Sequence, residues 1–155
     1  MTDKVREVDA VRDLLETQGR GVLATAGEGG SHASLMMFAA QEGGRGLIFA
    51  TMRATRKFEN LRQDPRAAIL IDNRTEVGGE SGKIMTVTAR GEVRECDEAE
   101  RPGLAASLVE RHPSLGEFVR EEGCAVMVLE VDHYRVVGRF RTGEDLEGKV
   151  GAEEL

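Results

Sequence analysis

The sequence lacks the features by which several classes of protein are recognised. It contains no tryptophan, one tyrosine, three histidines and two cysteines. No apolar stretch approaches the ~20 residues that a membrane-spanning helix needs. Acidic residues interrupt the N-terminal segment where a signal peptide would have its apolar core. We therefore expect a soluble, cytoplasmic protein that has no membrane partner.

The scarce cysteines and histidines argue against a metal centre. Cys96 and Cys124 belong to no CxxC or Cys/His pattern, and His32, His112 and His133 are scattered, without metal-ligand spacing. Two free thiols, in the core or at its rim, are expected in a reducing cytoplasm. The sequence also lacks a nucleophile elbow, a Walker loop and a GxGxxG motif, so acyl transfer and nucleotide hydrolysis have no support.

The chain has fewer basic than acidic residues, with 21 lysines and arginines and 28 aspartates and glutamates. The resulting net charge of −7 argues against nucleic acid and anionic membranes as partners, since both require a basic surface. It does not exclude a local basic pocket for one small phosphate ligand. A chain of 155 residues that is 40% hydrophobic is expected to form one globular domain with a sizeable core.

The most informative stretch covers residues 47–71. A short apolar run at its start predicts a buried strand that ends at Thr51. Thr55 is a good N-cap for a helix of about two turns. Asp64-Pro65 ends that helix, since proline cannot continue it and disfavours helical backbone in the residue before it. A second apolar run, residues 67–71, predicts the next strand.

Two cations occupy the first turn of this predicted helix. Arg56 and Lys57 lie where the helix dipole already places positive charge and where backbone N–H groups have no intrahelical acceptor. Several donors converge there without a carboxylate in that turn, which favours an anion site with phosphate as its usual occupant. The alternative is that both cations are solvated, at a cost of up to ~1 kcal/mol.

The other segments predict further strands and helices. Apolar spacing indicates an amphipathic helix over residues 3–18, and Asp97 with Glu100 forms a capping-box pattern before another helix. The expected strands cover residues 21–26, 32–40, 47–51, 67–71, 83–94, 124–131 and 134–140, and the later helices cover residues 100–111 and 114–122.

Short connections join these seven expected strands, which favours an antiparallel barrel with flanking helices. Gly91 is expected to mark a bulge, and Asp132-His133 to form a hairpin turn. The fold class is therefore mainly β, and residues 1–140 are expected to form a single domain. Residues 141–155 are polar and acidic, and we expect them to form a loose tail.

A family resemblance becomes apparent at this point. The succession GVLATA, HASLMMF, LIFAT and TRKFENLRQDPRAAILI resembles the pyridoxamine 5′-phosphate oxidase-like family of FMN-binding split barrels, over about residues 11–91. Its most specific part is the strand ending at Thr51, followed by Thr55-Arg56-Lys57 and by a helix that ends before Pro65. The resemblance implies an antiparallel split β-barrel in which this helix start holds the FMN phosphate.

The resemblance also implies which other residues bind the cofactor. Residues 35–38 and 50–51 should run along the flavin and its ribityl chain, and Thr86 should reach it from the second subunit of a homodimer. Strand alternation lets only one of the two neighbouring methionines face the cofactor, so the other should fill the core. The expected cofactor-binding residues are Met36, Met37, Phe38, Ala50, Thr51, Thr55, Arg56, Lys57 and Thr86.

Departures from the family pattern limit the functional prediction. True pyridoxamine phosphate oxidases carry an R-x-V-L-L-K pattern where this chain has SLMMFA, and an Arg- and His-bearing end where it has GEDLEGKVGAEEL. We therefore predict an FMN-dependent oxidoreductase that acts on another small molecule, with NAD(P)H as electron source and the flavin at a homodimer interface. No catalytic side chain is assigned, since the flavin supplies the chemistry. The alternative is a non-catalytic protein that binds or senses flavin, deazaflavin or haem, with an exposed histidine as axial haem ligand.

Overall fold

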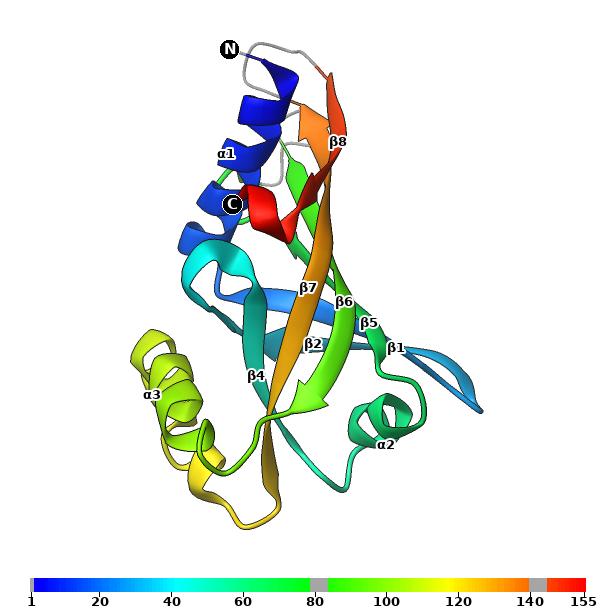
Figure 1. Ribbon diagram of the computed structural model, residues 1–155, viewed down its shortest axis with the longest axis vertical. Coiled ribbons are helices and arrows are strands. Elements are labelled where there is room, and N and C mark those ends of the chain that lie inside the picture. Colours follow the sequence, from blue (N-terminus) through cyan, green and yellow to red (C-terminus); the bar gives the residue numbers. More distant parts are fainter. Residues whose placement is uncertain (1, 79–83, 140–144) are drawn as a thin grey trace.

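The structure of the chain is a computed structural model that describes residues 2–78, 84–139 and 145–155. Its strands form one antiparallel sheet that curls into a half-barrel, and helices lie against different parts of that sheet (Figure 1). This arrangement confirms the predicted mainly β fold, an antiparallel split barrel with flanking helices. Within the described ranges, no helix is long and apolar enough to cross a membrane.

The strands are β1 (Arg20–Gly27), β2 (Gly30–Met37), β3 (Ala39–Ala40), β4 (Gly46–Met52), β5 (Arg66–Asp72), β6 (Met85–Glu95), β7 (Cys124–Arg139) and β8 (Asp145–Gly151). The helices are α1 (Asp3–Thr17), α2 (Arg56–Gln63) and α3 (Arg101–Arg111), with short 3-10 turns η1 (Glu42–Gly44), η3 (Pro113–Leu115), η4 (Phe118–Arg120) and η5 (Ala152–Glu154). The order in the sheet is β2-β1-β5-β6-β7-β4-β3. β4 pairs with the first half of β7 and β8 with its second half.

Two cores lie on opposite faces of the central strands. Alternate residues such as Phe49 of β4 and Ile69 of β5 point into the main core, which α1 covers with Val11 and Leu14. A smaller core lies beneath α3, where Leu108 packs against the other face of β4 and β7. Because β4 and the first half of β7 are covered on both faces, residues 47–50 and 124–129 are continuously apolar rather than alternating.

β7 differs from the prediction, because it is one long strand rather than a hairpin. The expected turn at Asp132-His133 is wrong: both residues lie inside β7. The bulge expected at Gly91 is confirmed, since Arg90 pairs with His133 whereas Gly91 pairs with Val131. One extra residue, Asp132, therefore enters β7 at this point, which is the usual structure of a bulge. A side chain on Gly91 would collide with the backbone carbonyl of Glu130, so glycine is required there.

The predicted tail is also corrected by the structure. Its described part, residues 145–155, forms β8 and η5 rather than a loose segment. Leu146 and Val150 are buried in the main core, four residues apart on one face of β8. Two apolar residues in an otherwise polar segment are too weak a pattern to predict a strand. Residues 141–144 of the predicted tail lie outside the described residues. The helix expected over residues 114–122 is replaced by the 3-10 turns η3 and η4.

Candidate functional site

The start of α2 is built on two threonines. Thr55 is the N-cap, as predicted: its Oγ1 accepts a hydrogen bond from the Phe58 N–H at 3.3 Å and donates one to the Met52 carbonyl at 2.8 Å. The hydroxyl of Thr51, a residue that is 1% exposed, lies 3.1 Å from the Thr55 hydroxyl. These bonds fix the end of β4 to the start of α2, so the first helical turn has one defined position.

Arg56 and Lys57 follow this cap as the first two residues of α2. Arg56 is exposed and Lys57 half-buried, and neither forms an ion pair with any other residue that the structure describes. Arg56 lies against the β1–β2 turn, where a Cβ on Gly29 would be 2.8 Å from its Nη1. The first turn also contains Glu59, contrary to the expectation of no carboxylate there.

A buried hydrogen bond holds α2 against β1. Asn60 is 3% exposed, and its Nδ2 donates to Thr25 Oγ1 at 3.2 Å. Its carboxamide lies so close to Gly27 that a side chain at that position would collide with it. Phe58 and Leu61 bury their side chains in the main core. The sequence analysis missed Asn60, because an asparagine in the middle of a short helix gives no signal of its buried partner.

The remaining predicted cofactor residues are dispersed over the chain. Met36 and Phe38 are buried in the main core, whereas Met37 is half-buried on the opposite face of β2. The expectation that one of the two methionines fills the core is therefore confirmed. Ala50 packs against the smaller core beneath α3. Thr86 lies on the outer face of β6, where its Oγ1 donates to the Val137 carbonyl at 3.1 Å. Within one chain, the structure thus groups only the four residues around the start of α2.

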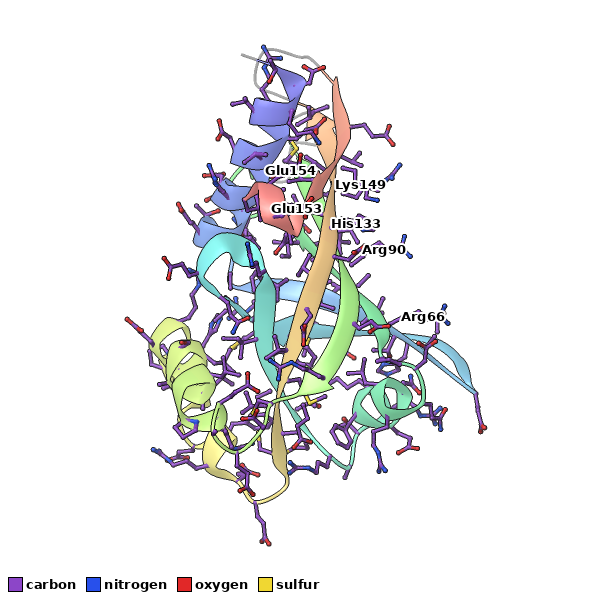
Figure 2. The ribbon with its side chains drawn as sticks, in the orientation of Figure 1. Arg66, Arg90, His133, Lys149, Glu153 and Glu154 are labelled. Carbon is purple, nitrogen blue, oxygen red and sulfur yellow. The ribbon has the colours of Figure 1, made fainter. Side chains whose placement is uncertain are left out.

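An open groove of about 1070 Å³ lies on the outer face of β1, β5, β6 and β7. Ala24, Ala26 and Ala68 form its floor, and charged residues from neighbouring strands surround them. Figure 2 shows Arg66, Arg90 and His133 projecting from the same side of the sheet. A second cavity of about 630 Å³ lies between α1, α3 and residues 39–44. Arg56 and Lys57 line neither of these two cavities.

Ion pairs at the rim of the groove lower the pKa of several carboxyl groups. Arg66 donates to both carboxylate oxygens of Asp64, at 3.0 and 2.8 Å, and this contact lowers the pKa of Asp64 to about 2. Arg94 bridges Glu130 and Glu100, and its hydrogen bonds lower the pKa of Glu100 to about 2. Asp64 and Glu100 therefore stay ionised well below neutral pH.

The cysteines and histidines are mostly engaged in structural contacts. Cys96 and Cys124 are buried free thiols, as predicted, and burial raises the pKa of both. His112 ends α3, and its Nε2 lies 2.8 Å from the Phe38 carbonyl. His32 contacts Ser34. Among the residues described, no three His, Cys, Asp or Glu side chains are grouped so that they could hold a metal ion.

The comparisons with known proteins agree on the fold. A family model described as pyridoxamine 5′-phosphate oxidase matches residues 8–136, whereas no curated protein sequence matches the chain. A haem-binding protein from Mycobacterium smegmatis superposes with a TM-score of 0.82 at 20% identity, over 99% of this chain and 60% of that chain. The present chain therefore spans about 60% of the length of that protein.

Two further solved structures share this fold. An FAD-binding protein from Mesorhizobium loti has a TM-score of 0.67 at 14% identity, over 83% of this chain and 91% of its own. The haem storage protein HutZ from Vibrio cholerae has a TM-score of 0.68 at 14% identity, over 81% of this chain and 89% of its own. At these identities the similarity concerns the fold alone, and the ligands in the names belong to those proteins.

Proposed function

This chain belongs to the pyridoxamine 5′-phosphate oxidase family, and from that premise we propose that it is an FMN-binding oxidoreductase acting on a small molecule. One observation carries the proposal: two cations without ion-pair partners among the described residues follow directly after the N-cap of α2. A bound phosphate would supply the missing counter-charge.

The chemistry of the donors fits a phosphate group. A guanidinium, an ammonium and the N–H groups of the first turn converge at one helix start, where the dipole also favours an anion. Thr55 already accepts from the Phe58 N–H, so the N–H groups of Arg56 and Lys57 are the ones left for a ligand. The Thr51–Thr55 contact and the buried Asn60 hold this turn in place before any ligand arrives. Glu59 accepts a hydrogen bond from Gln63 at 3.2 Å, which directs its carboxylate along the helix.

The role proposed for the protein is to bind and orient the cofactor. FMN, when bound, supplies hydride and electron transfer, with NAD(P)H as the proposed electron source. The side chains around the start of α2 would hold the phosphate, and no acid or base from the chain is required. The substrate is proposed to differ from pyridoxamine phosphate, since Ser34 and Ala39 stand where the family's R-x-V-L-L-K pattern has its two cations.

We further propose that the protein is a homodimer with the flavin at its interface. Leu35 is 69% and Leu70 40% exposed, and both lie beside Val22 in one row across β2, β1 and β5. Large apolar side chains grouped on a sheet face are typical of an interaction surface. Thr86 of β6 lies on the same face, two residues from the partner of Leu70. This position is consistent with the proposal that Thr86 reaches the cofactor of the other subunit.

Haem is the second candidate ligand, because two of the similar structures are described as haem-binding or haem-storage proteins. The absorbance spectrum of the purified protein separates the candidates. Flavin bands, with FMN identified after release, are the expected result, followed by NAD(P)H oxidation when an acceptor is added. A Soret band would support haem instead. A colourless protein that takes up neither FMN nor haem would contradict both candidates.

A further inference from the structure

The strand order places β2 and β3 at opposite ends of the sheet, although only Phe38 separates them in the chain. β2 pairs with β1, whereas β3 pairs with β4, so the chain passes at Phe38 from one edge of the sheet to the other. β2 and β4 are also in contact. Phe38 therefore lies at the seam of the half-barrel, the line along which its two edges face each other.

Two hydrogen bonds hold the backbone of Phe38 at this seam. Its N–H donates to the Gly19 carbonyl at 3.0 Å, and its carbonyl lies 2.8 Å from the Nε2 of His112, the residue that ends α3. Because a carbonyl oxygen only accepts hydrogen bonds, Nε2 is the donor. Phe38 is completely buried, so without His112 its carbonyl would be an unpaired polar group in the interior.

The imidazole of His112 is itself held in place. The residue is half-buried, and a Cβ on Gly19 would lie only 2.7 Å from its Cε1, so the ring packs directly against the backbone there. The backbone N–H of His112 donates to the carbonyl of Leu108 at 2.9 Å, and Leu108 is buried in the smaller core. Through this ring, α3 fixes the position of the seam.

The seam is joined to the start of α2 by the edge of β4. Ala39 pairs with Ile48, and after that pair no described strand joins β4 on this side. Thr51 follows three residues later, about 10 Å along the strand, and the start of α2 comes next. Figure 1 shows β4 running from this junction to the loop that leads to α2. This distance is close to the reach of an extended five-carbon chain, such as the ribityl chain of FMN.

We propose that His112 is a positioning residue for the ring end of the flavin site, an inference that rests on the proposed function. With the phosphate at the start of α2 and the ribityl chain along β4, the isoalloxazine ring is expected at the seam. The family resemblance likewise places Met37 and Phe38 along the flavin. His112 touches no ligand atom: by holding the backbone of Phe38, it sets the gap between β2 and β4 that receives the ring.

Titration of the full chain with FMN and with riboflavin, followed by flavin fluorescence, tests the proposal. His112→Ala should weaken both ligands by the same factor, about 3- to 10-fold, because the lost hydrogen bond acts on the ring end that they share. His112→Gln should restore most of the affinity, since its side-chain amide can donate to the Phe38 carbonyl from a similar position. The double variant Arg56→Ala, Lys57→Ala should weaken FMN alone.

Arg111→Gln is the matched control. The Nη2 of Arg111 donates to the Glu16 and Gln18 carbonyls at 2.7 and 2.9 Å, so this change disturbs the same end of α3 without removing the bond to Phe38. The visible absorption bands of the bound flavin depend on the surroundings of its ring. They should differ from those of the wild type in His112→Ala and not in Arg111→Gln.

Gly19→Ala provides a second way to disturb the seam. The new methyl group would displace the imidazole of His112, so this variant should also weaken both flavins. It keeps every hydrogen-bonding side chain, and it tests the proposal if His112→Ala does not fold. Circular dichroism and urea unfolding check that each variant is folded.

The outcomes separate this proposal from the proposed function. Unchanged affinity for both flavins in folded His112→Ala, or equal losses in His112→Ala and Arg111→Gln, would overturn the positioning role alone. A loss of FMN affinity without a loss of riboflavin affinity would also overturn it, because the effect would then lie at the phosphate. A wild type that binds neither flavin would contradict the proposed function and this inference together.

Discussion

The start of α2 and the groove are two charged regions that the chain builds in opposite ways. At α2, Thr55, Arg56 and Lys57 are consecutive, so the cap, the cations and the free N–H groups come from one turn. In the groove, Arg90 and His133 are far apart in sequence and meet only through the pairing of β6 with β7. A group built from consecutive residues can therefore be recognised in the sequence, whereas a group brought together by strand register cannot.

The two regions also differ in how their charges are compensated. Three of the four carboxylates that line the groove form ion pairs within the described residues. Around α2 both cations are unpaired among the described residues, while buried polar contacts beneath them fix the backbone. We infer that the α2 start is preorganised for a dianion.

The largest expected effect is on FMN affinity. The double substitution Arg56→Ala, Lys57→Ala should cost about 3 kcal/mol or more, a loss of over 100-fold, since charge-assisted contacts contribute ~1.5–3 kcal/mol each. Flavin fluorescence during titration measures it, with Arg62→Ala as the matched control. If the double variant binds FMN as tightly as the wild type, the phosphate lies elsewhere.

The next largest effect concerns the bulge that forms the groove. Gly91→Ala should lower the free energy of unfolding by about 1–3 kcal/mol, because the new methyl collides with the Glu130 carbonyl and backbone must move. Gly103→Ala is the control: it lies in α3 with open space around it, and should raise stability by about 0.5–1 kcal/mol. Urea unfolding measures both, and equal stabilities of the two variants would contradict the register described here.

The buried contact beneath α2 should matter slightly less. Asn60→Ala leaves the Thr25 hydroxyl without its partner, so the free energy of unfolding should fall by about 1–2 kcal/mol. FMN should also bind more weakly, because the helix that carries the two cations loses its attachment to β1. Arg62→Ala, on the exposed side of the same helix, is the control. Unchanged FMN affinity in a measurably destabilised Asn60 variant would show that this contact does not position the α2 start.

The smallest effect is the acid dependence of the ion pair between Arg94 and Glu100. Arg94 lowers the pKa of Glu100 from its ordinary 4.5 to about 2, so its contribution to stability is complete above about pH 4.5 and is lost as the pH falls towards 2. Glu100→Gln should therefore lower the melting temperature slightly at neutral pH, and the difference from wild type should vanish near pH 2. Glu98→Gln, an exposed control, should show no such difference, and a Glu100 effect that persisted at pH 2 would contradict this explanation.

Local signals carried most of what the sequence could predict. The N-cap at Thr55 and the bulge at Gly91 were correct because each depends on one residue's own conformational preference. Asp97 and Glu100 form the expected reciprocal hydrogen bonds before α3. The turn at Asp132-His133 was wrong, because polar residues inside a strand are indistinguishable from a turn until the bulge opposite them is known.

Other parts of the site required the assembled structure. The strand over residues 145–151 was missed, because only Leu146 and Val150 of a polar segment reach the core. The contact of Asn60 with Thr25 joins residues 35 positions apart, and nothing near either residue indicates it. Placing Ala50 beside the flavin remains a prediction, since the structure packs that residue towards α3 and one chain does not test the interface.

The comparison of FMN with riboflavin tests the central claim most directly, because the two ligands differ only in the phosphate. If the start of α2 holds that phosphate, the wild type should bind FMN over 100-fold more tightly than riboflavin. This preference should disappear in the Arg56→Ala, Lys57→Ala variant and persist in the Arg90→Gln variant. Equal affinities of the wild type for the two flavins, or a preference lost only with Arg90, would contradict the account.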